Sequence, residues 1–228
     1  KMKRLSTFIN NFGYHIHVGN EVRPKEVQKL LGKVEGTPEE ALISRLALRS
    51  MKQAKYTPEN SGHFGLAAKY YTHFTSPIRR YPDLQIHRII KENIRGRMND
   101  RRIEHYEKIL PEVAVQSSML ERRAEEAERE TVKLKKVEYM QERIGEEFEG
   151  VISGITKWGA YVELPNTVEG LIHINTLRDD YYVFDQDAYE LRGDMTGKIF
   201  RLGQKVRVRV ADADKMLKTV DFVLAEED

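Results

Sequence analysis

The chain has 228 residues, 40% of them hydrophobic, a formal net charge of +2 and no cysteine. This length is enough for one large or two modest domains with their own cores. The lack of cysteine excludes a disulfide framework and a thiolate zinc site, which fits a cytoplasmic protein. No apolar run approaches 18 residues and no charged-then-apolar leader opens the sequence, so we expect neither a membrane span nor secretion. Because the chain opens at Lys1 directly into a helical pattern, we expect it to be part of a longer protein.

The small net charge hides a split between the two parts of the chain. Residues 1–144 carry 28 lysines and arginines against 19 aspartates and glutamates, whereas residues 145–228 carry 10 against 17. The first part is therefore the better candidate to hold a polyanion.

Helical patterns punctuated by turns fill the first 60 residues. Residues 37–40, Thr-Pro-Glu-Glu, combine an N-cap, a proline at the first helical position and a capping-box glutamate. This signature predicts a helix over residues 41–54.

Residues 73–88, HFTSPIRRYPDLQIHR, concentrate basic, hydroxyl and aromatic side chains where a core would show apolar periodicity. The adjacent Arg79 and Arg80 can clamp phosphate oxygens in a bidentate manner, and the rings of His73, Phe74 and Tyr81 can stack on bases or pack as a wall. The alternative interpretation is a surface loop that opens a helix. Composition alone leaves both interpretations open.

Two further helices are predicted. The first runs from about Pro82 to Ile94 and ends at Gly96, with His87 either on its surface or functional. We expect its aliphatic side chains to face mostly inward: Leu84, Ile86, Ile89, Ile90 and Ile94. The second is a long polar helix from Ser118, where residues 118–121 form another capping-box pattern. A narrow stripe suits one packing face: Leu120, Ala124, Ala127, Thr131 and Leu134. We interpret this helix as a scaffold that joins two domains.

After Gly145 the hydrophobic pattern changes from helical to alternating. Five strands are predicted, over residues 147–155, 157–164, 168–174, 205–210 and 219–224. Five short strands with a glycine in the second predict a small closed Greek-key barrel of the OB type. Residues 175–196 are too long for a hairpin loop and are predicted to be a structured insertion. The aspartate pair at 179 and 180 invites a metal interpretation, but the spacing fits no EF-hand, and we predict no metal site.

The predicted fold class is therefore α+β. A mainly helical region over residues 1–144, including the long linking helix, precedes an OB-type barrel over residues 145–228. Two aromatic residues of the barrel, Trp158 and Tyr161, fall on opposite faces of the second strand by alternation, so one of them could be core. Residues 198–209 hold five basic residues and no acidic one, among them Lys205 and Arg207, which could line a groove for a nucleic-acid backbone.

The run GHFGLAAKYYTHFTSPIRRYPDLQIHR, residues 62–88, resembles the end of the catalytic domain in the ribonuclease II and R family of exoribonucleases. RSMKQAKY (residues 49–56) and ERRAEEAERE (residues 121–130) resemble the same family, and the insertion favours its R type. The resemblance implies the C-terminal half of a processive enzyme that hydrolyses RNA from the 3′ end to nucleoside 5′-monophosphates. Arg79 matches the family's catalytic-site arginine, which would hold the scissile phosphate, while Ser76, Arg80 and Tyr81 would position RNA or support the site.

The barrel sequence EFEGVISGITKWGAYVELPNTVEGLIHI resembles the RNA-binding repeat of the large protein of the small ribosomal subunit. In that family two aromatic residues around the glycine of the second strand, and the histidine that ends the third, form the RNA face. The matching positions are Trp158, Tyr161 and His173. Asp214 and Lys218 match the family's acidic and basic contacts. Stacking on such aromatic rings stabilises RNA binding by about 1 to 3 kcal/mol per base.

Hydrolysis by metal-activated water needs a cluster of carboxylates, and Asp83 is the only acidic residue in residues 62–88. We therefore expect Mg²⁺ to be held in the parent by residues outside this chain, and the chain alone to bind single-stranded RNA without cleaving it. Two alternatives remain: a non-catalytic RNA-binding module, and a docking surface for proteins of RNA decay or ribosome rescue.

Overall fold

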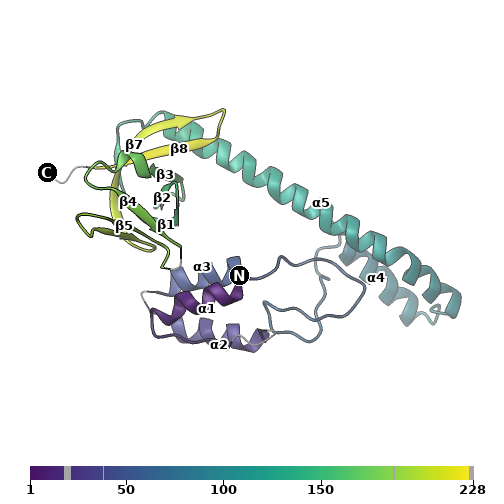
Figure 1. Ribbon diagram of the computed structural model, residues 1–228. Coiled ribbons are helices and arrows are strands. Elements are labelled where there is room, and N and C mark those ends of the chain that lie inside the picture. Colours follow the sequence, from purple (N-terminus) through teal and green to yellow (C-terminus); the bar gives the residue numbers. More distant parts are fainter. Residues whose placement is uncertain (18–21, 38, 187, 226–228) are drawn as a thin grey trace.

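The computed structural model describes residues 1–17, 22–37, 39–186 and 188–225. Five helices precede the strands: α1 (Met2–Asn10), α2 (Pro24–Val34), α3 (Glu40–Ser50), α4 (Tyr81–Ile94) and α5 (Asp100–Gln141). Helix α5 runs from α4 to the strand-rich part of the molecule, and the cluster of α1, α2 and α3 lies on the other side of that part (Figure 1). None of the helices in the described ranges is long and apolar enough to cross a membrane.

Helices α1 to α3 pack on one another because each carries apolar side chains three and four residues apart. Their shared core contains Leu5, Phe8, Ile9, Ile16, Val27, Leu30, Val34, Ile43 and Ala47. The capping box predicted for α3 is wrong. The Thr37 hydroxyl donates to the carbonyl of Val34 at 2.7 Å, and the Glu40 carboxylate accepts from the Gly36 amide at 2.8 Å, so both side chains bond back into the preceding turn. Helix α3 ends at Ser50, short of the predicted residue 54, and the predicted N1 residue Pro38 lies outside the described ranges.

Helix α4 begins and ends within one residue of its prediction, but its buried face differs. Ile90 is 40% exposed and Ile94 78% exposed, so the expectation that both face inward is wrong. The fully buried positions are the polar Asp83 and Gln85. His87 has a structural role: its Nε2 lies 2.8 Å from the carbonyl oxygen of Phe74, on whose ring it stacks.

Helix α5 begins 18 residues before the predicted start. The Asn99 side chain caps it by accepting from the Arg102 amide at 3.0 Å, and Pro111 lies within the helix. Ser118 is buried in the middle of the helix, so the second predicted capping box is also wrong. The predicted packing stripe is wrong as well, because Leu120, Ala124, Ala127 and Thr131 are exposed and Leu134 is only half-buried. The buried residues of α5 lie before and after this stretch: Tyr106, Ala114, Ser118, Val137 and Met140.

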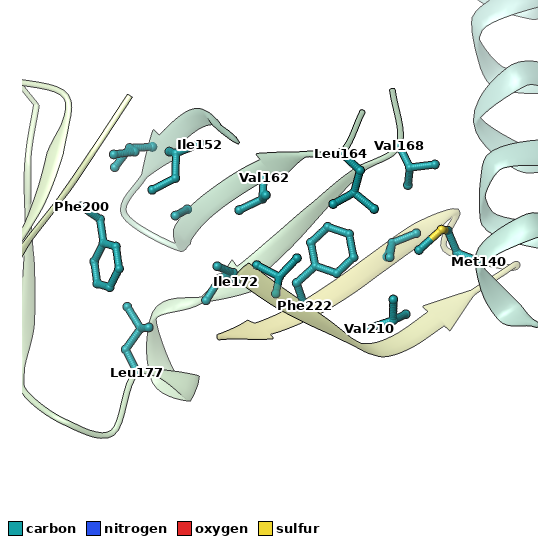
Figure 2. Close-up of a cluster of buried hydrophobic side chains, with 14 of the residues drawn as sticks. Met140, Ile152, Val162, Leu164, Val168, Ile172, Leu177, Phe200, Val210 and Phe222 are labelled. Carbon is teal, nitrogen blue, oxygen red and sulfur yellow. The ribbon is translucent and has the colours of Figure 1, made fainter. Parts of the chain in front are cut away.

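All five predicted strands are present: β1 (Glu147–Thr156), β2 (Gly159–Glu163), β3 (Glu169–His173), β7 (Lys205–Asp214) and β8 (Thr219–Leu224). They pair in the order β1-β2-β3-β8-β7, and β7 pairs back with β1 to close the barrel. Strand alternation turns Ile152, Val162 and Ile172 inward around Phe222 (Figure 2). Met140 reaches this core from α5 and thereby fixes the end of the helix to the barrel.

The insertion between β3 and β7 folds into a second sheet that the sequence did not predict. The insertion comprises the short 3₁₀ helix η1 (Ile174–Thr176) and the three strands of this sheet, β4 (Tyr182–Asp185), β5 (Glu190–Gly193) and β6 (Ile199–Arg201). Its Tyr182, Leu191 and Phe200 join the barrel core. The aspartate pair has structural roles, because Asp179 pairs with Lys198 at 3.0 Å and Asp180 accepts from the amides of Met195 and Thr196.

Candidate phosphate and RNA-binding site

The predicted phosphate site is a turn held by one buried carboxylate. Asp83, which is 0% exposed, sits in the first turn of α4. Its Oδ2 accepts from the Ser76 amide at 2.8 Å and from Arg80 Nη2 and Nε at 2.8 and 3.2 Å. The Ser76 carbonyl in turn accepts from the amides of Arg79 and Arg80. Burial alone would raise the pKa of Asp83, but the hydrogen bonds from Ser76 and Arg80 outweigh it and hold that pKa below its usual range.

The turn presents Arg79 to solvent while Arg80 faces inward. Arg79 is exposed, and within the described ranges its guanidinium has no ion pair. The neighbouring Ile78 is 97% exposed. By contrast, two nitrogens of Arg80 are committed to Asp83, and the Tyr81 hydroxyl accepts from Gln85 Nε2 at 2.7 Å. Of the two adjacent arginines, only Arg79 thus keeps its full planar fork for a phosphate.

The segment that leads into this turn is tied to helix α5. The Tyr56 hydroxyl donates to Glu121 at 3.0 Å and lies 2.9 Å from Nδ1 of His73, and the Tyr56 amide donates to the Ser118 hydroxyl at 2.9 Å. Burial and the Glu121 carboxylate raise the pKa of Tyr56 to about 12, so its hydroxyl remains a donor over the neutral range. Ser118 and Glu121, predicted as caps, therefore anchor this segment instead. His73 contributes to the anchor and does not stack on Phe74.

A glycine allows the predicted aromatic face of the barrel to form. Gly159 has φ +142, which side chains rarely adopt, and a Cβ there would overlap the carbonyl of Ile172 on β3. Gly159 pairs with His173, and Tyr161 with the next outward residue of β3, Leu171. Tyr161 and His173 are partly exposed on the same outer side, because the intervening Ala160 and Ile172 face the core.

Neither aromatic residue is core. Trp158 is 57% exposed in the turn before β2, and its carbonyl accepts from the Ile174 amide just after His173. The structure thus places Trp158 and His173 at one end of the β2–β3 pair and Tyr161 at its middle, on the same outer side as His173. Strand alternation left open whether Trp158 or Tyr161 belongs to the core, and both side chains are accessible to a base.

The three predicted basic contacts have different environments. Arg207 Nε lies 3.0 Å from Glu147 on the neighbouring strand β1. Lys205, on the same outer side of β7, has no ion pair within the described ranges. Lys218 pairs with Glu130 of α5 at 2.6 Å, and it lies directly before β8, which runs parallel to β3. Lys218 is therefore at the opposite end of the barrel from His173, so the structure does not bring it to the aromatic residues.

Among the residues that the structure describes, no group of three or more histidines, cysteines, aspartates or glutamates is arranged to hold a metal ion. The carboxylate nearest to Arg79 in sequence, Asp83, is already engaged with Arg80 and Ser76. Its second oxygen, Oδ1, is buried with no hydrogen-bond partner in the described ranges. The donor set around the turn does not fit a catalytic metal, which needs several carboxylates with open coordination positions.

Sequence reasoning missed Asp83, the residue that organizes the site. Its signal was present: it is the only acidic residue in residues 62–88 and follows Arg80 by three positions, a spacing at which helical side chains meet. The anchor formed by Tyr56 was also missed, because its partners lie 62 and 65 residues away in sequence.

Comparisons with known proteins agree with this organization. An RNB domain model matches residues 1–96 and an S1 RNA binding domain model matches residues 141–223. Ribonuclease R 1 of Lactococcus lactis is 45% identical over 223 residues, covering 97% of this chain and 27% of that protein. The apo form of Mycoplasma genitalium RNase R superposes with a TM-score of 0.87 at 26% identity, covering 98% of this chain and 36% of that one. Yeast Ssd1, a pseudonuclease, superposes with a TM-score of 0.63 at 25% identity, covering 85% of this chain and 25% of that one.

The covered fractions of the relatives correct the expectation that the chain is half of such an enzyme. The chain spans 27% of the Lactococcus protein and 36% of the Mycoplasma chain, so it corresponds to about a third of its relatives and not to a half. The RNB match precedes the S1 match, and most of helix α5 lies between them. The chain is therefore a homologue of ribonuclease R that carries an RNB segment followed by an S1 RNA-binding domain.

Proposed function

We propose that this chain is the RNA-gripping part of a cytoplasmic 3′ to 5′ exoribonuclease that hydrolyses RNA processively to nucleoside 5′-monophosphates. The observation that carries the proposal is the exposed Arg79, which has no ion pair among the described residues, on a turn whose flanks are fixed by the buried Asp83. Homology to ribonuclease R over 97% of the chain supports the reaction class. Single-stranded RNA with a free 3′ end is the proposed substrate, and the Mycoplasma enzyme has been solved in complex with single-stranded RNA.

Arg79 would hold the scissile phosphate. Its planar guanidinium can donate two parallel hydrogen bonds to phosphate oxygens and offset the negative charge that develops on them in the transition state. Ser76 and Arg80 would support the turn, and Tyr81, at the start of α4, would line the RNA path. Mg²⁺ would supply the activated water when bound, and we place its ligands outside this chain because the carboxylate beside the turn is already occupied.

The barrel, which we assign to the OB type with a boundary between residues 144 and 145, would hold RNA upstream of the reacting end. Trp158, Tyr161 and His173 would form the stacking face, and Lys205 and Arg207 would follow the backbone. The boundary is supported by the end of α5 at Gln141 and the start of β1 at Glu147. Lys218 would contact RNA only if the RNA displaced Glu130 from its ion pair with Lys218.

A non-catalytic RNA-binding module is the second candidate function. The likeness to yeast Ssd1, a pseudonuclease, favours it, because it shows that this architecture also occurs without a nuclease activity. A partner protein in RNA decay or ribosome rescue would then use the exposed middle of α5.

Replacement of Arg79 by lysine in a full-length protein that carries this chain tests the proposal. Lysine keeps the charge but not the fork, so turnover should fall about 10²-fold while RNA affinity changes little. An unchanged single-turnover rate, or a loss of affinity alone, would make Arg79 a binding residue and favour the second candidate.

A further inference from the structure

We infer that Asp83 is a positioning residue for Arg79: its buried carboxylate fixes the turn on both sides of the arginine and keeps Arg80 away from the phosphate. This inference rests on the proposed role of Arg79. Asp83 would touch neither RNA nor metal, and it would act on catalysis only through the geometry of the Ser76–Arg80 turn.

The hydrogen bonds of Asp83 bracket Arg79 in sequence. One oxygen, Oδ2, accepts hydrogen bonds from the Ser76 amide, three residues before Arg79, and from two nitrogens of Arg80, directly after Arg79. The Ser76 carbonyl then accepts from the Arg79 amide at 3.2 Å and from the Arg80 amide at 3.0 Å. The tip of the turn, Ile78 and Arg79, is exposed. These hydrogen bonds therefore fix the backbone from which the exposed and flexible Arg79 side chain extends.

The burial of Asp83 makes this base sensitive to substitution. The carboxylate is 0% exposed, and the Arg80 side chain is 20% exposed. Removing one member of such a pair leaves the other charge without compensation, which costs more than the loss of a surface pair. An amide at position 83 can still accept from Ser76, but it cannot neutralise Arg80. The Arg80 guanidinium would then be released toward solvent, where it would compete with Arg79 for the same phosphate.

A double-mutant cycle in a full-length protein that carries this chain tests the inference. Asp83→Asn should lower kcat by about 10- to 100-fold, the loss expected when a reacting group is misplaced by about 1 Å, with less than about a threefold change in KM. In an Arg79→Lys background, Asp83→Asn should cause no further loss, because both changes remove the same contribution. Asp100→Asn is the matched control, since Asp100 is exposed in the first turn of α5 and should leave kcat unchanged.

Thermal melts separate positioning from unfolding. If Asp83→Asn fails to fold, Arg80→Lys replaces it: lysine keeps the charge beside Asp83 but loses the two-nitrogen contact, so kcat should fall less and again not add to Arg79→Lys. Multiplicative losses in the double mutant, or equal losses in kcat and KM, would overturn the inference. An Arg79→Lys enzyme with normal turnover would instead overturn the proposed function, so the two failures are distinguishable.

Discussion

Lys218 and Glu130 join the turn between β7 and β8 to helix α5 through an ion pair of 2.6 Å. A second pair, Lys215 with Glu138, lies two helical turns further along α5 at 2.6 Å. Together with Met140 in the barrel core, these contacts fix the barrel to the C-terminal part of a helix whose middle carries the anchor of the phosphate turn. The two proposed RNA contacts, Arg79 and the aromatic face, are thus parts of one connected structure.

We predict that the contact between barrel and helix weakens in acid. Hydrogen bonds from Lys135 and Lys215 lower the pKa of Glu138 from 4.5 to about 2. A carboxylate with a lowered folded-state pKa stabilises the fold above its unfolded pKa and loses this contribution as the pH falls through the folded value. The protection factors of amides in the β7–β8 turn, which compare their exchange with the intrinsic rate at the same pH, should therefore fall between pH 4.5 and 2, and Glu138→Gln should diminish this step. The exposed Glu142→Gln is the control, and an unchanged step in Glu138→Gln would contradict the assignment.

Gly159→Ala should unfold the barrel more easily. The residue has φ +142, and an added Cβ would overlap the Ile172 carbonyl, so we expect a loss of about 3 kcal/mol or more in the free energy of unfolding. Gly32→Ala is the matched control: Gly32 lies within α2 with open space around it, and alanine should stabilise the helix by about 1 kcal/mol. Denaturant titrations of both variants give the comparison. Equal stability in the two variants would show that β2 does not need this backbone conformation.

Trp158→Ala should weaken the binding of single-stranded RNA by about 1 to 3 kcal/mol with little dependence on base sequence, because it removes one stacking platform. The fold should survive, since the ring is 57% exposed. Tyr161→Ala should have the same effect on binding. Tyr181→Ala removes a ring that is 74% exposed in the insertion and is not part of the proposed face, and it should leave affinity unchanged. Fluorescence anisotropy with labelled oligonucleotides, with circular dichroism on each variant, measures both properties, and an equal loss for Tyr181→Ala would rule out a localized stacking face.

Lys205→Ala and Arg207→Ala should differ in their salt dependence. Loss of one phosphate contact to a single strand lowers the slope of log affinity against log salt by about 0.7. We expect this change for Lys205, which has no ion pair in the described ranges. Arg207 should contribute less because Glu147 already neutralises it at 3.0 Å. Titrations at several salt concentrations provide the slopes, and a larger effect of Arg207→Ala would place the backbone path nearer to Glu147 than we propose.

Local patterns predicted the elements of the fold better than their contacts. The five barrel strands and the limits of α4 follow from alternation and from proline and glycine signals, which act within a few residues. The start of α5 was misplaced because a serine–glutamate spacing reads as a capping box, whereas in the fold Ser118 and Glu121 bond to Tyr56. Burial was misjudged in the middle of α5, where an apolar stripe has nothing to pack against among the described residues.

For the candidate site, too, the sequence predicted the residues better than their contacts. Residue type and resemblance singled out Arg79, Trp158, Tyr161 and His173, and the structure leaves all four accessible. Residue type alone could not separate Arg79 from Arg80, which only the resemblance distinguished, because the buried position of Asp83 determines which arginine is engaged. The resemblance also named Lys218 as an RNA contact, and the parallel pairing of β3 with β8 puts it at the other end of the barrel from His173.

The central claim is that this chain grips RNA but does not hold the metal that cleaves it. The most direct measurement is incubation of the purified chain with a 5′-labelled single-stranded oligoribonucleotide and Mg²⁺, with gel-shift and denaturing-gel analysis of the same samples. We predict a shifted complex in which the RNA stays intact. Trp158→Ala should reduce the amount of this complex. Steady release of nucleoside monophosphates by the chain, or no complex at any protein concentration, would contradict the account.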